Sequence, residues 1–362
     1  MRVVGQFCVA TVSGSQAATR PVDRGARTVV FGVDVTPNSY TLAGSDVSIP
    51  LLGVGTWAWG DRATWGMGGY DADLTRASIQ EAWSVSLDAG VTLFDTAEVY
   101  GGGESERIIG SMIAHDAQRA ASAVIASKFL PFPWKLRVRG ALLKSLRASL
   151  GRLGLTTLDL YQIHGPISLR SHAALADALA DAHEMGLVKA VGVSNYSAGE
   201  TRAMAAALRS RGMRLATNQI EFSLLRRSPE TSGLLTTCKE LGVVPIAYSP
   251  LGQGRLTGKY SVLQPPPRRR NFGNYPMAVV EDVVAELRRI GDKHGGKTPG
   301  QVGLNWVIAK GAVPIPGAKN GHQAEENAGA LDWNIDEEDL ARLDEVALPG
   351  VRSPRGRIWQ HG

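Results

Sequence analysis

The chain has 362 residues, 44% of them hydrophobic and 20% charged, and two cysteines, Cys8 and Cys238. This composition excludes a disordered or fibrous chain and a disulfide framework, and no apolar run approaches the roughly 18 residues that span a bilayer. The formal charge of +5 resides in the two ends, because residues 1–40 carry +2 and residues 351–362 carry +3. The body between them is neutral, which argues against binding to nucleic acid.

The first 38 residues differ in composition from the rest. They contain four arginines but no lysine or glutamate, among a scatter of serine, threonine, alanine and valine. Such Arg-rich, acid-poor composition is typical of organelle transit peptides, and the lack of a continuous apolar core argues against a secretory signal. We therefore expect a transit peptide over residues 1–38, with a disordered extension as the alternative. A cut before residue 38 should then remove no ordered structure.

Short β-rich segments alternate with helical ones from residue 51 onward, after a predicted hairpin at residues 40–50 that plugs the amino-terminal end of the fold. Most of the β-rich segments are apolar throughout, which is typical of parallel strands buried on both faces. The eight predicted strands are residues 51–55, 92–94, 123–127, 158–163, 190–193, 217–219, 243–247 and 313–315.

Eight successive strand–helix units predict one closed (β/α)8 barrel, a TIM barrel, over residues 39–350. Two extra helices are expected at residues 279–294 and 336–348, on either side of the last barrel helix at 299–310. A doubly wound sheet is the alternative architecture, but no G-x-G-x-x-G motif follows any predicted strand. Residues 351–362 are expected to form a basic tail.

Ionisable residues follow three consecutive predicted strands. Asp95 follows the second strand, Lys128 the third and His164 the fourth, while Tyr100 lies in the loop after Asp95. The carboxyl ends of barrel strands converge on one rim, where active sites form, so these four side chains should meet. A cation beside a phenol lowers its pKa, and a carboxylate holds the cation in place. The set predicts a catalytic proton donor, although each residue alone has a structural explanation as a helix cap or a solvated rim group.

Nine motifs in order along the barrel carry a resemblance to a known family. They occupy residues 55–60, 95–101, 127–129 with 133–134, 159–164, 192–196, 218–219, 248–251, 256–260 and 314–319. On these residues the chain resembles the aldo-keto reductases, and more narrowly their plastid-type plant and algal members. The likeness covers roughly residues 40–348.

The resemblance implies an NADPH-dependent reductase of aldehydes and ketones. By that analogy Tyr100 is the general acid, Lys128 lowers its pKa, Asp95 pairs with Lys128, and His164 positions the substrate carbonyl. The cofactor-binding residues that it implies are Thr56, Trp57, Ser194, Asn195, Gln219, Tyr248, Ser249, Pro250, Leu251, Lys259, Gly317, Lys319, Gln323, Glu326 and Asn327.

Within this set, the resemblance assigns the nicotinamide carboxamide to Ser194, Asn195 and Gln219, and the ring to Tyr248, which stacks on one face. The residues from Ser249 onward belong to the pyrophosphate and adenine end. The polar residues at 323, 326 and 327 have an alternative explanation as a solvated helix face.

Two alternative functions stay open. Pyridoxal reductases resemble this chain too, so a specific vitamin-aldehyde reductase is one alternative. Potassium-channel β-subunits share the fold and cofactor site, so a cofactor-sensing binding module is the other. The histidines lack metal-site spacings, and we expect no metal, no membrane partner and no nucleic-acid partner. A small carbonyl compound is the expected partner, in a plastid or alternatively in the cytoplasm.

Overall fold

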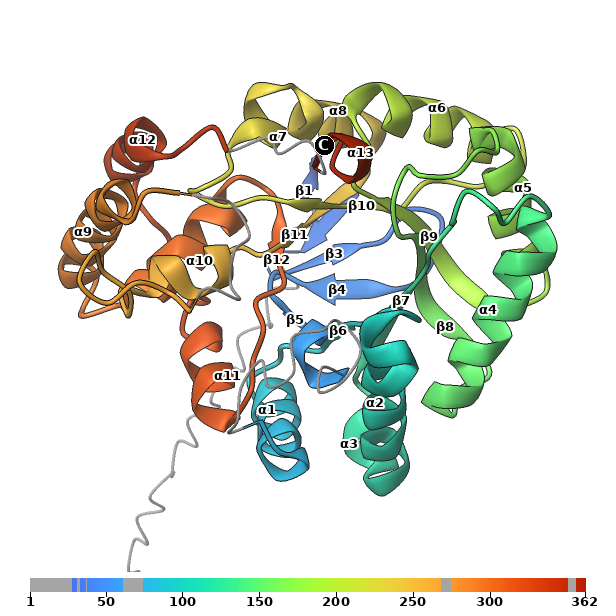
Figure 1. Cartoon of the computed structure of the whole chain (residues 1–362), viewed down its shortest axis with the longest axis horizontal. Coiled ribbons are helices and arrows are strands. Elements are labelled where there is room, and N and C mark those ends of the chain that lie inside the picture. Colours follow the sequence, from blue (N-terminus) through green and yellow to red (C-terminus); the bar gives the residue numbers. More distant parts are fainter. Residues whose placement is uncertain (1–27, 31–32, 37, 61–73, 268–274, 351–355) are drawn as a thin grey trace, which may run out of the picture.

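A barrel of eight parallel strands forms the centre of the molecule (Figure 1). The computed structural model describes residues 28–30, 33–36, 38–60, 74–267, 275–350 and 356–362. The barrel strands are β5 (Gly53–Gly55), β6 (Leu93–Asp95), β7 (Val124–Phe129), β8 (Leu158–Ile163), β9 (Val188–Ser194), β10 (Thr217–Glu221), β11 (Val244–Tyr248) and β12 (Val313–Pro314).

Each strand pairs with the next in chain order, from β5 to β12. The amide of Gly55 donates to the carbonyl of Pro316 at 3.0 Å, which joins the last strand to the first. This order confirms the predicted (β/α)8 barrel and excludes the doubly wound sheet, whose strand order is not sequential.

Five barrel strands, namely β6, β7, β9, β10 and β11, run one or two residues further toward the rim than the sequence predicts. β6 includes Asp95, β7 includes Lys128, and β10 runs on to Glu221. Charged residues weaken the apolar pattern by which a buried strand is recognised, so the predicted strands stop before them. Here the barrel wall itself holds these side chains, with Lys128 in register opposite Gln162 of β8.

The predicted hairpin closes the amino-terminal end of the barrel. It consists of β3 (Ser39–Thr41) and β4 (Ser48–Pro50), which pair antiparallel. Leu42, Val47 and Ile49 are buried and pack against the apolar side chains that point inward from the first residues of the barrel strands. This prediction is confirmed, and the plug leaves the carboxyl ends of the strands as the open rim.

Two further strands precede the hairpin. β1 (Thr28–Val30) pairs antiparallel with β2 (Val33–Thr36), which in turn pairs with β3. The boundary predicted at residue 38 therefore cuts a four-stranded sheet, and the expectation that nothing ordered precedes it is wrong. The valines at every second position of β2 indicate a strand. The Arg-rich, acid-poor composition of the whole segment, however, favoured a transit peptide over a strand. The rest of the predicted transit peptide, residues 1–27, lies outside the described residues.

Helices follow the strands and cover the outer face of the barrel (Figure 1). They are α1 (Arg76–Asp88), α2 (Glu104–His115), α3 (Ala117–Ala120), α4 (Val138–Leu153), α5 (His172–Glu184), α6 (Ala198–Arg209), α7 (Ser228–Thr231), α8 (Leu234–Leu241), α9 (Met277–Lys293), α10 (Pro299–Ala309), α11 (Gly321–Ala328), α12 (Glu337–Val346) and α13 (Gly356–Trp359). Three 3-10 helices complete the fold, namely η1 (Trp57–Gly60), η2 (Tyr100–Gly103) and η3 (Gly252–Thr257). Over the described residues, none of the helices has the length and apolar character needed to cross a membrane.

The three helices predicted near the end of the barrel are present as α9, α10 and α12. Local sequence explains their sharp ends. Thr298, for example, caps α10 through a reciprocal hydrogen-bonding box with Gln301, and Pro299 occupies the first turn. α13 lies inside the predicted basic tail, of which residues 351–355 lie outside the described part of the chain.

Candidate active site

The four ionisable residues predicted to meet at the rim lie together. Asp95 ends β6, Lys128 lies on β7, Tyr100 begins η2, and His164 directly follows β8. The Lys128 ammonium donates to Asp95 Oδ1 at 2.5 Å and to the Tyr100 hydroxyl at 3.2 Å. The ring centroids of Tyr100 and His164 are 5.7 Å apart, with the rings edge to face. One ammonium therefore links a carboxylate to a phenol that lies beside an imidazole.

Lys128 is fully buried, and three acceptors satisfy its three donors. Besides Asp95 and Tyr100, the carbonyl of Thr96 accepts at 2.8 Å. Burial lowers the pKa of Lys128, but the Asp95 carboxylate and the Tyr100 phenol outweigh it, so the pKa lies above its usual value. Lys128 is therefore a permanent, fixed positive charge against the phenol.

A left-handed turn presents the Tyr100 hydroxyl to Lys128. Gly101 has a φ of 59°, and a Cβ at that position would lie 2.0 Å from the carbonyl oxygen of Gly60. Only glycine fits this close approach. Burial raises the pKa of the Tyr100 phenol, Lys128 works against that rise, and Asp95 adds to it. Lys128 thus lowers the pKa of Tyr100, as the sequence predicts, but desolvation outweighs the cation and the net direction is upward. The phenol is thus protonated at neutral pH.

His164 is neutral at physiological pH. Burial, together with the charge of Lys128, holds the pKa of its imidazole well below the usual range. Its side chain is 8% exposed, and Nδ1 finds no hydrogen-bond partner among the described residues. A neutral imidazole in this position can donate to or accept from a polar ligand at the rim.

Two glutamines hold the second oxygen of the Asp95 carboxylate. Gln219 donates to Asp95 Oδ2 at 2.7 Å and Gln162 donates at 3.3 Å. Gln162 also accepts from the Thr217 hydroxyl at 3.2 Å. Sequence analysis did not single out Gln162, although a glutamine between apolar residues at the end of a predicted strand is a signal of an inward-facing polar role. Gln219, assigned by resemblance to the carboxamide, donates to the Asp95 carboxylate in this structure.

The other residues assigned to the nicotinamide form a connected set beyond β9 and β11. Tyr248 donates to Asn195 Oδ1 at 2.9 Å, and the Asn195 amide lies 3.2 Å from the Ser194 hydroxyl. Asn195 and Ser249 have φ values of 64° and 51°, in the left-handed region that non-glycine residues seldom adopt. Such strain is concentrated at ligand sites, where the surrounding structure maintains it.

Two predicted cofactor residues lie after β5. The hydroxyl of Thr56 is fully buried, and it donates to the carbonyl of Asp95 at 2.9 Å. Its backbone amide donates to the same carbonyl at 3.0 Å, so the amide and the side chain of Thr56 both brace the end of β6. Trp57 opens η1 at the rim.

The remaining predicted cofactor residues lie on the loops after β11 and β12. Ser249, Pro250 and Leu251 lead into η3, and Lys259 follows it; a Cβ on Gly254 would lie 2.8 Å from the Lys259 ammonium. The residues after β12 contact α11 at two points: Lys319 N donates to Gln323 Oε1 at 3.1 Å, and Asn327 Nδ2 donates to Gly317 O at 3.3 Å. Thr298, which caps the start of α10, donates to Glu326 Oε1 of α11 at 3.2 Å. The solvated-face explanation of α11 is therefore incomplete, since its polar face is bonded to the rim.

Residues 358–362, which the sequence placed in a basic tail, lie against this site. The Trp359 indole is 5.4 Å from the His164 ring between centroids, and Gln360 donates to the Tyr248 hydroxyl at 2.9 Å. Sequence analysis missed them because contacts between residues more than 100 positions apart leave no local pattern in the chain.

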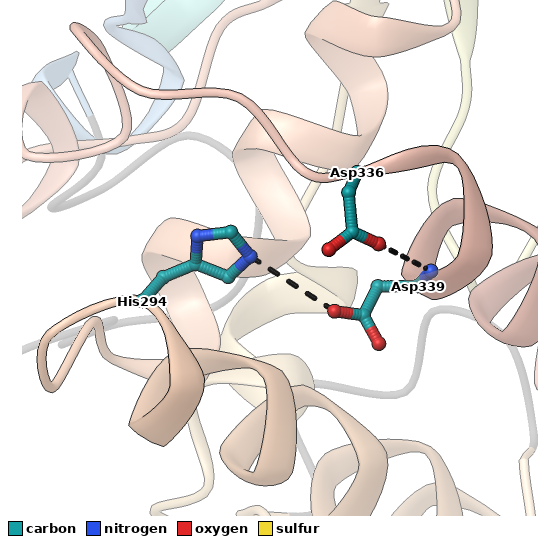
Figure 2. A group of neighbouring side chains, drawn as sticks. All are labelled: His294, Asp336 and Asp339. Carbon is teal, nitrogen blue, oxygen red and sulfur yellow. Dashed lines mark hydrogen bonds and ion pairs between the residues drawn. The ribbon is translucent and has the colours of Figure 1, made fainter.

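One cluster with metal-ligand chemistry lies outside this rim, between α9 and α12 (Figure 2). His294, Asp336 and Asp339 bring their ligand atoms within 4.8 Å of one another. Lys293 donates to Asp336 at 2.5 Å and to Asp339 at 2.8 Å, and Arg289 also contacts Asp339. These cations neutralise both carboxylates, so the cluster fits an ion-pair network that joins two helices better than a cation site.

Comparison with known proteins agrees with this geometry. The model of the aldo/keto reductase family matches residues 51–348. The chain is 38% identical over 328 residues to the chloroplastic pyridoxal reductase of Arabidopsis thaliana, covering 87% of each protein. It is 31% identical to the L-glyceraldehyde 3-phosphate reductase of Escherichia coli K12, over 87% of this chain and 93% of that one.

Solved structures with similar folds also belong to oxidoreductases. The glycerol dehydrogenase of Gluconobacter oxydans matches with a TM-score of 0.73 and 28% identity, over 88% of this chain and 98% of that one. An aldo/keto reductase of Klebsiella pneumoniae, in complex with NADP and acetate, matches with a TM-score of 0.64 and 28% identity, over 86% and 96% of the two chains. The chain therefore belongs to the aldo/keto reductase family and is an oxidoreductase.

Proposed function

We propose that the protein reduces aldehydes or ketones to alcohols with NADPH, and that Tyr100 is the general acid. The observation that carries this proposal is the contact of a buried, permanently charged Lys128 with a phenol that is itself protonated at neutral pH. A protonated acid next to a fixed cation can give up its proton at the moment when negative charge develops on a carbonyl oxygen.

The residues divide the chemical work. NADPH supplies the hydride when it is bound. Tyr100 donates its proton to the carbonyl oxygen, and Lys128 stabilises the phenolate left behind. Asp95 keeps Lys128 in place from the opposite side, held in turn by Gln219. His164, neutral and 5.7 Å from the Tyr100 ring, orients the carbonyl oxygen by hydrogen bonding.

The chain's own residues fit a nicotinamide cofactor. Amide and hydroxyl groups of Asn195 and Ser194 match the polar carboxamide, and the strained backbone at Asn195 and Ser249 is the kind that a ligand site maintains. The Tyr248 ring offers a flat face that shields one side of a nicotinamide. Lys259 and Lys319, on the two loops that follow β11 and β12, supply positive charge for phosphate groups.

Removal of the Lys319 charge should weaken NADPH binding selectively. A charge-assisted bond to a phosphate contributes roughly 1.5–3 kcal/mol, so Lys319→Ala should raise the Kd for NADPH about tenfold or more. Binding of NADH, which lacks the 2′-phosphate, should hardly change. Fluorescence titration of both cofactors measures this, with Lys144→Ala, on the exposed face of α4, as a control expected to bind as the wild type does. Equal wild-type affinity for NADPH and NADH would contradict the assignment.

The similarity to a pyridoxal reductase favours a second, narrower candidate. That relative is 38% identical over nearly the whole barrel, so pyridoxal belongs in the substrate screen beside simple aldehydes and ketones. The screen follows the loss of NADPH absorbance with each compound. High kcat/KM for pyridoxal against low values for the rest supports the narrower function. NADPH binding without turnover of any carbonyl compound supports the alternative, a cofactor-sensing binding module.

Location in a plastid is part of the proposal. It is supported by the Arg-rich, acid-poor composition of residues 1–38 and by the chloroplastic relative. Because β1 begins at Thr28, we expect residues 1–27, which hold all four arginines of the segment, to direct a fused fluorescent protein to plastids in a plant or algal cell. Fluorescence that stays in the cytosol, while the same fusion with a known plastid leader is imported, would overturn the location.

A further inference from the structure

Residues 360 and 361 are hydrogen-bonded at the carboxyl ends of three neighbouring barrel strands, β9, β10 and β11. The amide of His361 donates to the carbonyl of Asn195 at 3.1 Å, after β9. Gln360 donates to Glu221 at 2.5 Å, at the end of β10, and to Tyr248 at 2.9 Å, at the end of β11. Gln360 and His361 thus each have defined hydrogen-bond partners at the rim.

A buried arginine fixes the end of this segment. Arg226 is 2% exposed, and its guanidinium donates to the carbonyl oxygen of Gly362 at 2.7 Å. Gly362 is itself buried, and a Cβ there would lie 3.0 Å from the carbonyl oxygen of Tyr196. His361 adds a contact of 2.8 Å to Glu200, at the start of α6. Residues 360–362 are therefore an anchor, and they hold the preceding side chain in one place.

That preceding side chain is Trp359, which lies beside the reacting end of the site. Its indole meets the His164 ring edge to face, with centroids 5.4 Å apart. The Tyr100 ring contacts the same imidazole at 5.7 Å. His164 thus separates the proton donor from a large flat apolar surface that comes from a distant part of the chain.

The Trp359 indole packs directly against Gly165, where a larger residue would crowd it. A Cβ at position 165 would lie 3.1 Å from Cζ3 and 3.2 Å from Cη2 of Trp359, closer than ordinary van der Waals contact. The φ of Gly165 does not require glycine, so the absence of a side chain serves packing and not the backbone. The space that a side chain at position 165 would occupy is thus taken by the Trp359 indole.

We propose that Trp359 is a specificity-determining residue: it forms the flat wall of the substrate pocket beside His164 and favours carbonyl compounds whose carbonyl is attached to a planar ring. This inference rests on the proposed function. An indole attracts a second ring through dispersion and its quadrupole, whereas a short alkyl chain gains little from it. Trp359 lies against His164 and not against Tyr100, so it acts on the choice of substrate and not on proton transfer.

The test compares one ring aldehyde with one short aliphatic aldehyde on the full chain. We define the ring preference as kcat/KM for benzaldehyde divided by kcat/KM for propanal, both with NADPH. Trp359→Ala should lower the ring preference about tenfold, and Trp359→Phe should keep most of it. Ile358→Ala is the matched control, because the neighbouring side chain is 68% exposed and should not affect the ratio.

A second pair of variants tests the contact with Gly165. Gly165→Ala pushes on the indole, so it should lower the ring preference in the wild-type background. In the Trp359→Ala background the same change should have no further effect, because residues in contact are coupled and this contact is then absent. Independent effects of the two changes contradict the proposed contact.

The possible results distinguish this inference from the proposed function. An unchanged ring preference in both Trp359 variants overturns the inference and leaves the reductase assignment intact. An equal loss with both aldehydes, in Trp359→Phe as well as Trp359→Ala, shows a structural role and also overturns it. Absence of turnover in the wild type with both aldehydes and with every other carbonyl compound of the substrate screen overturns the proposed function itself.

Discussion

Replacing Tyr100 with phenylalanine should lower kcat for carbonyl reduction by about 10²-fold or more, the usual contribution of a positioned proton donor. The phenyl ring keeps the edge-to-face contact with His164, so the change removes only the hydroxyl that donates the proton and accepts from Lys128. Steady-state kinetics with a reactive aldehyde and NADPH measures the effect. The Kd for NADPH should stay close to the wild-type value, because the proposed cofactor residues lie on other strands.

A matched variant separates loss of the acid from damage to the turn. Tyr196→Phe removes the hydroxyl of another buried tyrosine near the rim and should leave kcat nearly unchanged. If Tyr100→Phe retains wild-type kcat while binding NADPH normally, another group donates the proton and the assignment of the acid fails.

Replacing Lys128 with methionine should lower both stability and activity. Asp95 and Lys128 are 1% and 0% exposed and form an ion pair at 2.5 Å. Removing one member of a buried pair leaves an uncompensated charge, which typically costs about 3–5 kcal/mol of unfolding free energy. Activity should fall as well, because no cation then stabilises the Tyr100 phenolate. Urea unfolding and steady-state kinetics measure the two effects.

The double variant Lys128→Met, Asp95→Asn tests the cause of each loss. The neutral amide at position 95 no longer needs a cation and keeps acceptors for Gln219 and Gln162. Stability should therefore recover to a large extent, while kcat stays low. Recovery of both quantities would show that Lys128 has no part in proton transfer, and recovery of neither would show that the pair is not the source of the lost stability.

Much of the fold could be predicted because its signals are local. β8 matches the predicted residues 158–163 at both ends, since four of its six residues are apolar or aromatic and turns bound the segment. The hairpin plug was readable from apolar residues such as Leu42 and Ile49. The strands β1 and β2 escaped prediction because the composition of the N-terminal segment favoured a targeting peptide over a packed sheet.

The site was predictable to the extent that a barrel brings strand ends together. Asp95, Lys128 and His164 could be grouped because each follows a predicted strand in a parallel barrel. The upward direction of the pKa of Tyr100 could not be predicted, because it depends on how deeply the rim is covered. Trp359 was not predictable either, since its place beside His164 is fixed by tertiary contacts of the residues that follow it.

Transfer of deuterium from labelled NADPH to the product tests the central claim most directly. The purified full chain is given an aldehyde and NADPH that is deuterated at C4 of the nicotinamide, on one face and then on the other. Because a ring stacked on Tyr248 is shielded on one side, we expect one labelled form to yield an alcohol with deuterium on the carbinol carbon, and the other to yield unlabelled alcohol. Alcohol without deuterium from both forms, or NADPH binding with no alcohol formed, would contradict reduction by hydride transfer at this site.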